Sequence, residues 1–169
     1  QGSKETEVRA RVGGILLKRN YVEGSTVKEG DVLFEIDPEP FKVALEQAKA
    51  SLAQNKAQLK AAETQWARIS KLFEQRVVSE KSRDDALANL DSLRASTQLA
   101  KAQVDKAQLD LGYTTVKAPI SGVTSMEAQS EGSLIATTDS SSLLTTITQL
   151  DPMYVIFSAS ENEILALTN

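Results

Sequence analysis

The stretch from Phe41 to Leu111 contains neither glycine nor proline, although the rest of the chain holds eight glycines and four prolines. These two residues interrupt helices most strongly, and the stretch is rich in alanine and glutamine. We therefore predict helix over residues 41–111. The segments on either side contain short β-branched runs separated by Gly, Pro, Asp and Ser, which is typical of strands and turns. The sequence thus predicts an α+β protein in which a long helical block interrupts a β-rich domain.

Apolar and small residues in this block recur at alternating spacings of four and three, which is the seam of a coiled coil. The first set is Phe41, Leu45, Ala48, Leu52, Asn55, Leu59, Ala62, Trp66, Ile69 and Phe73, and the second set is Ala86, Leu90, Leu93, Thr97, Ala100, Val104, Ala107 and Leu111. If the first set is extended in steps of seven residues, its next positions are the charged residues Arg76, Glu80 and Arg83, which do not suit a packed seam. The register therefore breaks between the two sets. We predict a turn near residues 74–79 and two antiparallel helices that form a coiled-coil hairpin.

Capping signals support these helix ends. Asp37 is suited to cap the first helix, with Pro38 at its first helical position. Ser79 followed by Glu80 is suited to start the second helix, because serine caps well and an acidic side chain favours the first turn.

The two flanking segments resemble each other. A shift of 108 residues pairs Gly14 with Gly122, and residues 23–25 (Glu-Gly-Ser) with residues 131–133. Each half then consists of strand, turn, strand, turn and strand. Neither half is able to bury its apolar face alone, so we predict that the two halves pair into one small β-sandwich, with the hairpin inserted between them.

Composition excludes most catalytic classes. The chain has no histidine and no cysteine, which removes Ser-His-Asp and Cys-His nucleophiles, zinc fingers, haem-His ligation, iron–sulfur clusters and disulfides. The net charge of −4 disfavours nucleic acid as a partner. Adjacent carboxylates such as Asp84 and Asp85 do not face each other on a helix. We predict that the protein is not an enzyme and needs no cofactor and no metal.

The segments 12–15, 23–25 and 30–38 resemble the first half of a split biotinyl/lipoyl-like domain, and residues 115–135 resemble the second half. The order of segments over residues 5–169 resembles the periplasmic adaptor, or membrane fusion protein, family of tripartite RND-type multidrug efflux pumps. The fold that this resemblance implies is a lipoyl-like β-sandwich split by the hairpin, plus an incomplete β-barrel portion. Its expected domains are residues 11–40 with 112–148 for the lipoyl-like domain, 41–111 for the hairpin, and 1–10 with 149–169 for the partial β-barrel.

Residues 149–155 look like the entry to that barrel. We expect strands near residues 7–10 and 153–157, and a helix start at the capping box of residues 160–163. In this family the mature chain begins with a lipidated cysteine or a membrane helix. The resemblance therefore implies a core fragment of a longer adaptor, located in the periplasm and anchored to the inner membrane by a part absent from this chain.

The resemblance also implies a docking site at the hairpin tip. Adaptors of this family carry an Arg, a Leu four residues later and a Ser eleven after the Arg, and this chain has Arg68, Leu72 and Ser79 at those spacings. Arg68 offers five donors to acceptor groups on a TolC-type outer-membrane channel, and Leu72 offers apolar contact area. Residues 76–78 are expected to shape the tip. Each of the three residues also has a plainer interpretation. Arg68 would be a solvated flank of the coiled coil, Leu72 would cover the end of the hairpin, and Ser79 would be only an N-cap.

The implied partners are a TolC-type outer-membrane channel, an RND-type inner-membrane transporter and further copies of the chain, with a hexamer in the full assembly. Alternatives are an adaptor for an ABC- or MFS-type exporter, and a coiled-coil scaffold or spacer without a channel partner. A biotin or lipoate carrier is disfavoured, because the hairpin replaces the turn that would hold the modified lysine, and neither Lys28 nor Lys117 lies at that junction.

Overall fold

The computed structural model describes residues 4–138 and 140–149. The chain divides into two compact units, one with the strands and one helical unit, Asp37–Thr114. The elements are β1 (Lys4–Arg9), β2 (Gly14–Arg19), β3 (Thr26–Val27), β4 (Val32–Ile36), α1 (Glu39–Glu74), α2 (Glu80–Gly112), β5 (Thr115–Lys117), β6 (Gly122–Thr124), β7 (Leu134–Ile135), the 3-10 helix η1 (Ser140–Ser142) and β8 (Leu143–Gln149). The predicted α+β fold with a helical hairpin is confirmed.

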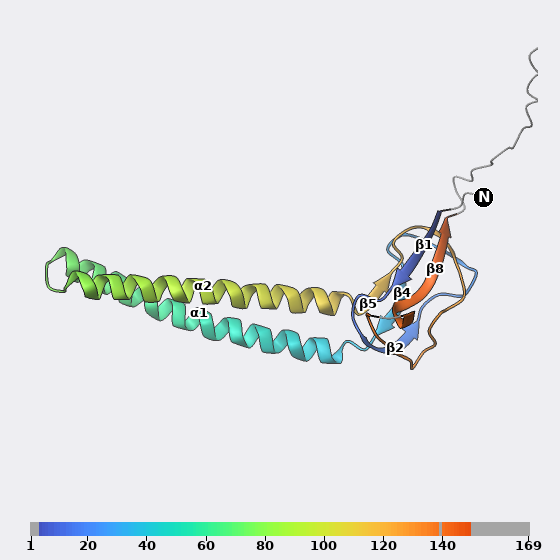
Figure 1. The fold of residues 1–169 in the computed structure, drawn as a ribbon, viewed down its shortest axis with the longest axis horizontal. Coiled ribbons are helices and arrows are strands. Elements are labelled where there is room, and N and C mark those ends of the chain that lie inside the picture. The colour runs from blue at the N-terminus through green and yellow to red at the C-terminus, as the bar shows by residue number, and fades with distance from the viewer. Residues whose placement is uncertain (1–3, 139, 150–169) are drawn as a thin grey trace, which may run out of the picture. The chain divides into compact units, whose positions relative to one another are not determined.

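The helical unit is a hairpin in which α1 and α2 lie side by side (Figure 1). Every residue of the two predicted seam sets is buried or half-buried. Leu90 and Ala100 on α2, and Leu45 and Ala62 on α1, are buried most completely. The 3.5-residue period therefore identified the packed faces of both helices. Within the described residues no helix is long and apolar enough to cross a membrane.

The start of α1 differs from the prediction by one position. Pro38 is the N-cap and not the first helical residue, and the helix begins at Glu39 with Pro40 in its first turn. Proline is tolerated there because the first amides of a helix have no partner within the helix. Asp37 still satisfies one of them, since its carboxylate accepts the Glu39 N–H at 3.0 Å. Asp37 therefore caps the helix from the position before the N-cap residue, Pro38.

The other unit consists of two four-stranded sheets with the orders β1-β8-β6-β3 and β5-β4-β2-β7. These orders are equivalent under the sequence repeat. The 108-residue shift maps β1, β2 and β3 onto β5, β6 and β7. Three additional residues in the second half then raise the shift to 111, which maps β4 onto β8. Each sheet is therefore built from strands of both halves of the chain.

The strand register confirms the repeat residue by residue. Gly14 pairs with Ile135 in β2–β7, and the equivalent Val27 pairs with Gly122 in β3–β6. The turn amides follow the same rule across the two halves. Gly24 donates its N–H to the Thr124 carbonyl at 3.0 Å. Its counterpart Gly132 donates to the Leu16 carbonyl at 2.7 Å.

The two turn glutamates clamp the halves to each other. The Glu131 carboxylate accepts the backbone N–H of Arg19 at 2.8 Å. The Glu23 carboxylate accepts the N–H of Glu127, the equivalent of Arg19, at 2.9 Å. Arg19 further pairs with Glu23 at 2.9 Å and Glu127 at 3.4 Å. Each turn thus satisfies an amide of the opposite half, which stabilises the paired arrangement.

The expected N-terminal strand exists as β1, in the segment that the family resemblance assigns to the partial β-barrel. In the structure β1 pairs antiparallel with β8. It occupies the position in its sheet that β5 occupies in the other, and Val8 and Ala10 at its end are buried. The described pairing of β1 therefore lies within the sandwich. The strand expected at 153–157 and the capping box at 160–163 lie outside the described residues.

The core of this unit comes from the strands of both halves. Its largest fully buried side chains are Phe34, Leu16, Leu33, Ile36, Ile135, Leu144 and Ile147. Tyr21 contacts Phe34 edge to face, with ring centroids 5.3 Å apart. Burial of this apolar area from both halves is the main driving force for closing the sandwich.

Two glycine-to-alanine substitutions should have opposite effects on stability. A Cβ at Gly122 would lie 2.5 Å from the Thr148 carbonyl oxygen and 2.8 Å from Ile147 Cγ2. We expect Gly122→Ala to lower the free energy of unfolding by about 1–3 kcal/mol, because β6 would have to move away from β8. A Cβ at Gly112, at the end of α2, meets nothing within 4 Å. Gly112→Ala should raise stability by up to about 1 kcal/mol.

Urea unfolding of the two variants measures both effects. A Gly122→Ala protein as stable as the unsubstituted chain would contradict the close β6–β8 pairing.

Candidate functional site

The hairpin tip comprises residues 68–85. Helix α1 ends within it, with Gln75 as its C-cap. The Arg76 N–H donates to the Phe73 carbonyl at 2.8 Å, and the Val77 N–H donates to the Leu72 carbonyl at 2.9 Å. With Gln75 as the C-cap, these two bonds form a Schellman motif. Arg76 has the left-handed conformation that the motif requires, with φ at +60°. The backbone of the tip is therefore held in one geometry.

Ser79 starts the second helix, as the sequence predicted. Its backbone is extended and its side-chain oxygen accepts the Ser82 N–H at 3.2 Å. The two serine hydroxyls are 3.0 Å apart. The capping interpretation of Ser79 is confirmed, while its contact with a partner stays a prediction.

The first turns of α2 carry charges that are paired with one another. The Arg83 guanidinium bonds to Asp84 at 2.8 Å and to Glu80 at 3.2 Å, and its carbon lies 4.4 Å from the centre of the Phe73 ring. The hydrogen bond to Asp84 raises the pKa of Arg83 above its ordinary value. This stacking of Arg83 on Phe73 links α2 to the last turn of α1.

Lys81 is likewise paired, with its ammonium 2.7 Å from Asp85. The hydrogen bond to Asp85, and the attraction to its charge, raise the pKa of Lys81. The basic residues that begin α2 are thus engaged within the helix itself.

All three predicted docking residues lie at this end of the hairpin. Arg68 is exposed and Leu72 is half-buried, one helical turn apart on α1, and the exposed Ser79 lies across the loop. Arg68 makes no ion pair within the described part of the chain. Their proximity follows from the predicted turn, whereas their role in docking is untested by the geometry.

Sequence reasoning assigned residues 76–78 only a part in shaping the tip and missed two features there. Arg76 has positive φ, and Val77 has 66% of its surface exposed. One signal was available, because the first helix ends without the glycine that often follows a helix.

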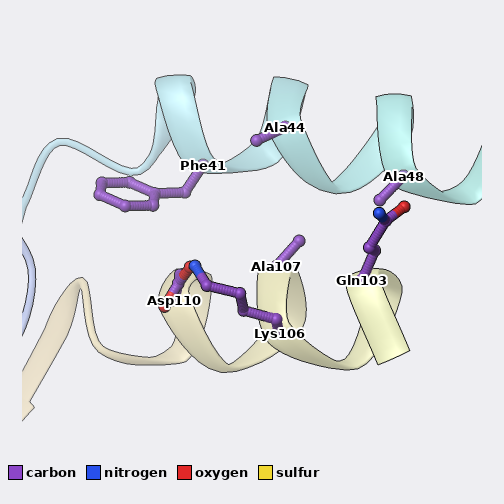
Figure 2. Close-up of a pocket in the computed structure, with 7 residues that line it drawn as sticks. All are labelled: Phe41, Ala44, Ala48, Gln103, Lys106, Ala107 and Asp110. Carbon is purple, nitrogen blue, oxygen red and sulfur yellow. The ribbon is translucent and has the colours of Figure 1, made fainter. Parts of the chain in front are cut away.

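A cleft of about 220 Å³ lies between α1 and α2 at the other end of the hairpin. Figure 2 shows its lining, in which Ala48 and Gln103 face each other across the gap between the helices. Phe41 and Ala107 also line it, and the Lys106–Asp110 ion pair of 2.6 Å lies at its side. Its volume is below that of typical small-molecule sites. The described residues contain no cluster of three or more metal-ligating His, Cys, Asp or Glu side chains.

Comparison with known proteins identifies the class to which this arrangement belongs. A family model described as "RND MFP, barrel-sandwich hybrid domain" matches residues 4–147. Because the match covers most of the chain, the protein belongs to this family, the barrel-sandwich hybrid domain of RND-type membrane fusion proteins.

The relatives are efflux proteins. The chain is 53% identical over 160 residues to the efflux pump periplasmic linker BepD of Brucella suis biovar 1 (strain 1330), covering 95% of this chain and 40% of that protein. It is 38% identical over 161 residues to the multidrug efflux pump subunit AcrA of Escherichia coli (strain K12), again covering 95% and 40%. The chain therefore spans about 40% of the length of the curated relatives it matches.

Solved structures agree on the fold. A MacA-MexA chimera containing the Pseudomonas aeruginosa MexA α-hairpin domain matches with a TM-score of 0.58 and 28% identity, covering 87% of this chain and 48% of that one. ZneB from Cupriavidus metallidurans matches with a TM-score of 0.60 and 23% identity, covering 86% and 61%. At that identity ZneB supports the fold alone.

Removal of the cap should weaken the hairpin. We expect Ser79→Ala to lower stability by about 0.5–2 kcal/mol, because the Ser82 N–H loses its acceptor, and Ser79→Asn to retain most of it. Ser92→Ala, at an exposed serine inside α2, should leave stability unchanged or slightly higher. Thermal unfolding followed by circular dichroism at the helix band compares the three variants. Equal midpoints for Ser79→Ala and Ser92→Ala would mean that the cap contributes nothing.

Proposed function

We propose that this chain is the core of a periplasmic adaptor that bridges an inner-membrane RND-type transporter to a TolC-type outer-membrane channel in a tripartite drug efflux pump. The hairpin tip is the docking element for the channel, and Arg68, Leu72 and Ser79 are its contact residues. The working protein lies in the periplasm, attached to the inner membrane through parts outside this chain, and it assembles with copies of itself into a hexamer.

The observation that carries this proposal is the arrangement of the tip. A guanidinium that is exposed and without an ion pair in the described residues, a half-buried leucine and a capping serine lie at one end of a hairpin with a defined turn. Arg68 has five donors available for carbonyls or carboxylates of a partner. The chemistry needed is recognition only, which matches a chain without histidine or cysteine.

The comparisons support the same function at a coarser level. BepD is named an efflux pump periplasmic linker and AcrA a multidrug efflux pump subunit. The family description names RND, which favours this transporter type over an ABC or MFS exporter.

Charge reversal at Arg68 tests the docking role. The full-length protein is expressed with its own transporter and channel in an efflux-deficient Gram-negative host, and drug resistance is measured. We expect Arg68→Asp to abolish resistance while leaving the periplasmic level and thermal midpoint unchanged, because an exposed residue contributes little to stability. Lys56→Asp is the matched control, since it reverses an exposed charge on α1 about 18 Å closer to the sandwich end of the helix. It should retain resistance.

A folded Arg68→Asp protein that confers full resistance would overturn the assignment of the tip. The hairpin would then act as a spacer.

A further inference from the structure

Arg76 is the only described non-glycine residue with a positive φ. The other described residues near the left-handed region are Gly24, Gly30 and Gly132, with φ of +73°, +91° and +85°. The chain therefore uses glycine wherever else its described backbone takes such a conformation, and departs from this rule once, at the hairpin tip. An L-residue is less stable than glycine in this conformation because its Cβ crowds the following carbonyl.

The backbone at this position explains the conformation but not the side chain. The Schellman bonds of Arg76 and Val77 require a left-handed residue after Gln75, and glycine provides it with the least strain. Asparagine would be the next best choice. A cation near the helix C-terminus is favoured by the helix dipole, but Lys71 in the last turn of α1 already supplies one without a positive φ.

Contacts within the tip do not explain the arginine either. Arg76 is exposed, and no ion pair or hydrogen bond of its guanidinium is found among the described residues. The acids that begin α2 are engaged elsewhere, Glu80 and Asp84 with Arg83. The hairpin turn therefore requires the left-handed conformation at this position but not this guanidinium, and a non-glycine residue held in such a conformation is characteristic of functional sites.

We infer that Arg76 is itself a docking residue, whose guanidinium binds carboxylate or carbonyl oxygens at the end of the outer-membrane channel. This inference rests on the function proposed above and adds a fourth contact to it. Arg76 and Arg68 supply two guanidiniums without ion pairs in the described chain, and the exposed Val77 adds apolar surface beside them. The fixed backbone holds the Cα of Arg76 in place before binding, which lowers the backbone part of the entropic cost of docking.

Three substitutions separate the roles of backbone and side chain. Arg76→Gly relieves the strain and removes the guanidinium. Arg76→Gln removes the charge and keeps the strain, without the flexibility of glycine. Arg76→Lys keeps both the charge and the strain. Each is made in the full-length protein and tested for drug resistance with its own transporter and channel, together with thermal unfolding of the purified protein.

We expect Arg76→Gly to be more stable and less active. Its thermal midpoint should rise by about 2–4 °C, and docking should weaken about tenfold, with a fall in resistance. Arg76→Gln should lose resistance without the gain in stability, and Arg76→Lys should retain more resistance than either. A more stable protein with weaker function is an outcome that a purely structural role for Arg76 does not produce.

The outcomes distinguish this inference from the proposed function. If Arg68→Asp abolishes resistance while Arg76→Gly retains it, docking at the tip stands and the inference about Arg76 is wrong. If Arg76→Gly loses resistance but Arg76→Gln retains it, the loss comes from flexibility and the inference is also wrong. If the folded Arg68→Asp protein confers full resistance, the tip is not the docking element, and the inference about Arg76 falls with it.

Discussion

The pairing of the two sequence repeats is the constraint on which the rest of this structure depends. Neither repeat buries its apolar face alone, so each sheet takes strands from both halves. One consequence concerns the helical insertion. Glu35 near the end of β4 pairs with Thr115 at the start of β5, so the sheet itself holds the two ends of the inserted segment together. Strand pairing in the sandwich thereby offsets the entropic cost of bringing together the two ends of a long inserted segment.

The hairpin depends on a seam of modest strength. Its packed positions include many small or polar residues, and Thr97 directs its hydroxyl to the Leu93 carbonyl at 2.8 Å. Small side chains bury little apolar area, and at the Phe41 end they leave a cleft between the helices. Stability at the opposite end comes from different sources: the Schellman motif, the Ser79 cap and the stacking of Arg83 on Phe73. The turn is thus well defined although the seam is weak.

A defined turn that displays arginines without ion pairs in the described structure fits the docking role proposed for the hairpin tip. The basic side chains at the start of α2 are neutralised by neighbours on the same helix, whereas Arg68 and Arg76 have no ion pair in the described structure.

The sequence by itself determined the features that depend on local periodicity and turn chemistry. These are the packed faces of α1 and α2, the turn between them, the Ser79 cap and the register of the repeat. It also brought Arg68, Leu72 and Ser79 to one end of the hairpin, because that placement follows from helix spacing alone. Their function as contacts stays a prediction, since nothing in the chain's own geometry measures affinity for a partner.

Only the tertiary structure decided which groups satisfy each other across the fold. The exchange of glutamate contacts by Glu23 and Glu131, and the pairing of β1 with β8, join residues far apart in sequence, whose proximity no local pattern specifies. The one-residue shift at Pro38 and the left-handed Arg76 were also visible only in the structure, although the hydrogen bonds that fix them are local. In both cases the fold assigned a residue to a backbone position by the hydrogen bonds available there, and local propensity alone would have chosen differently.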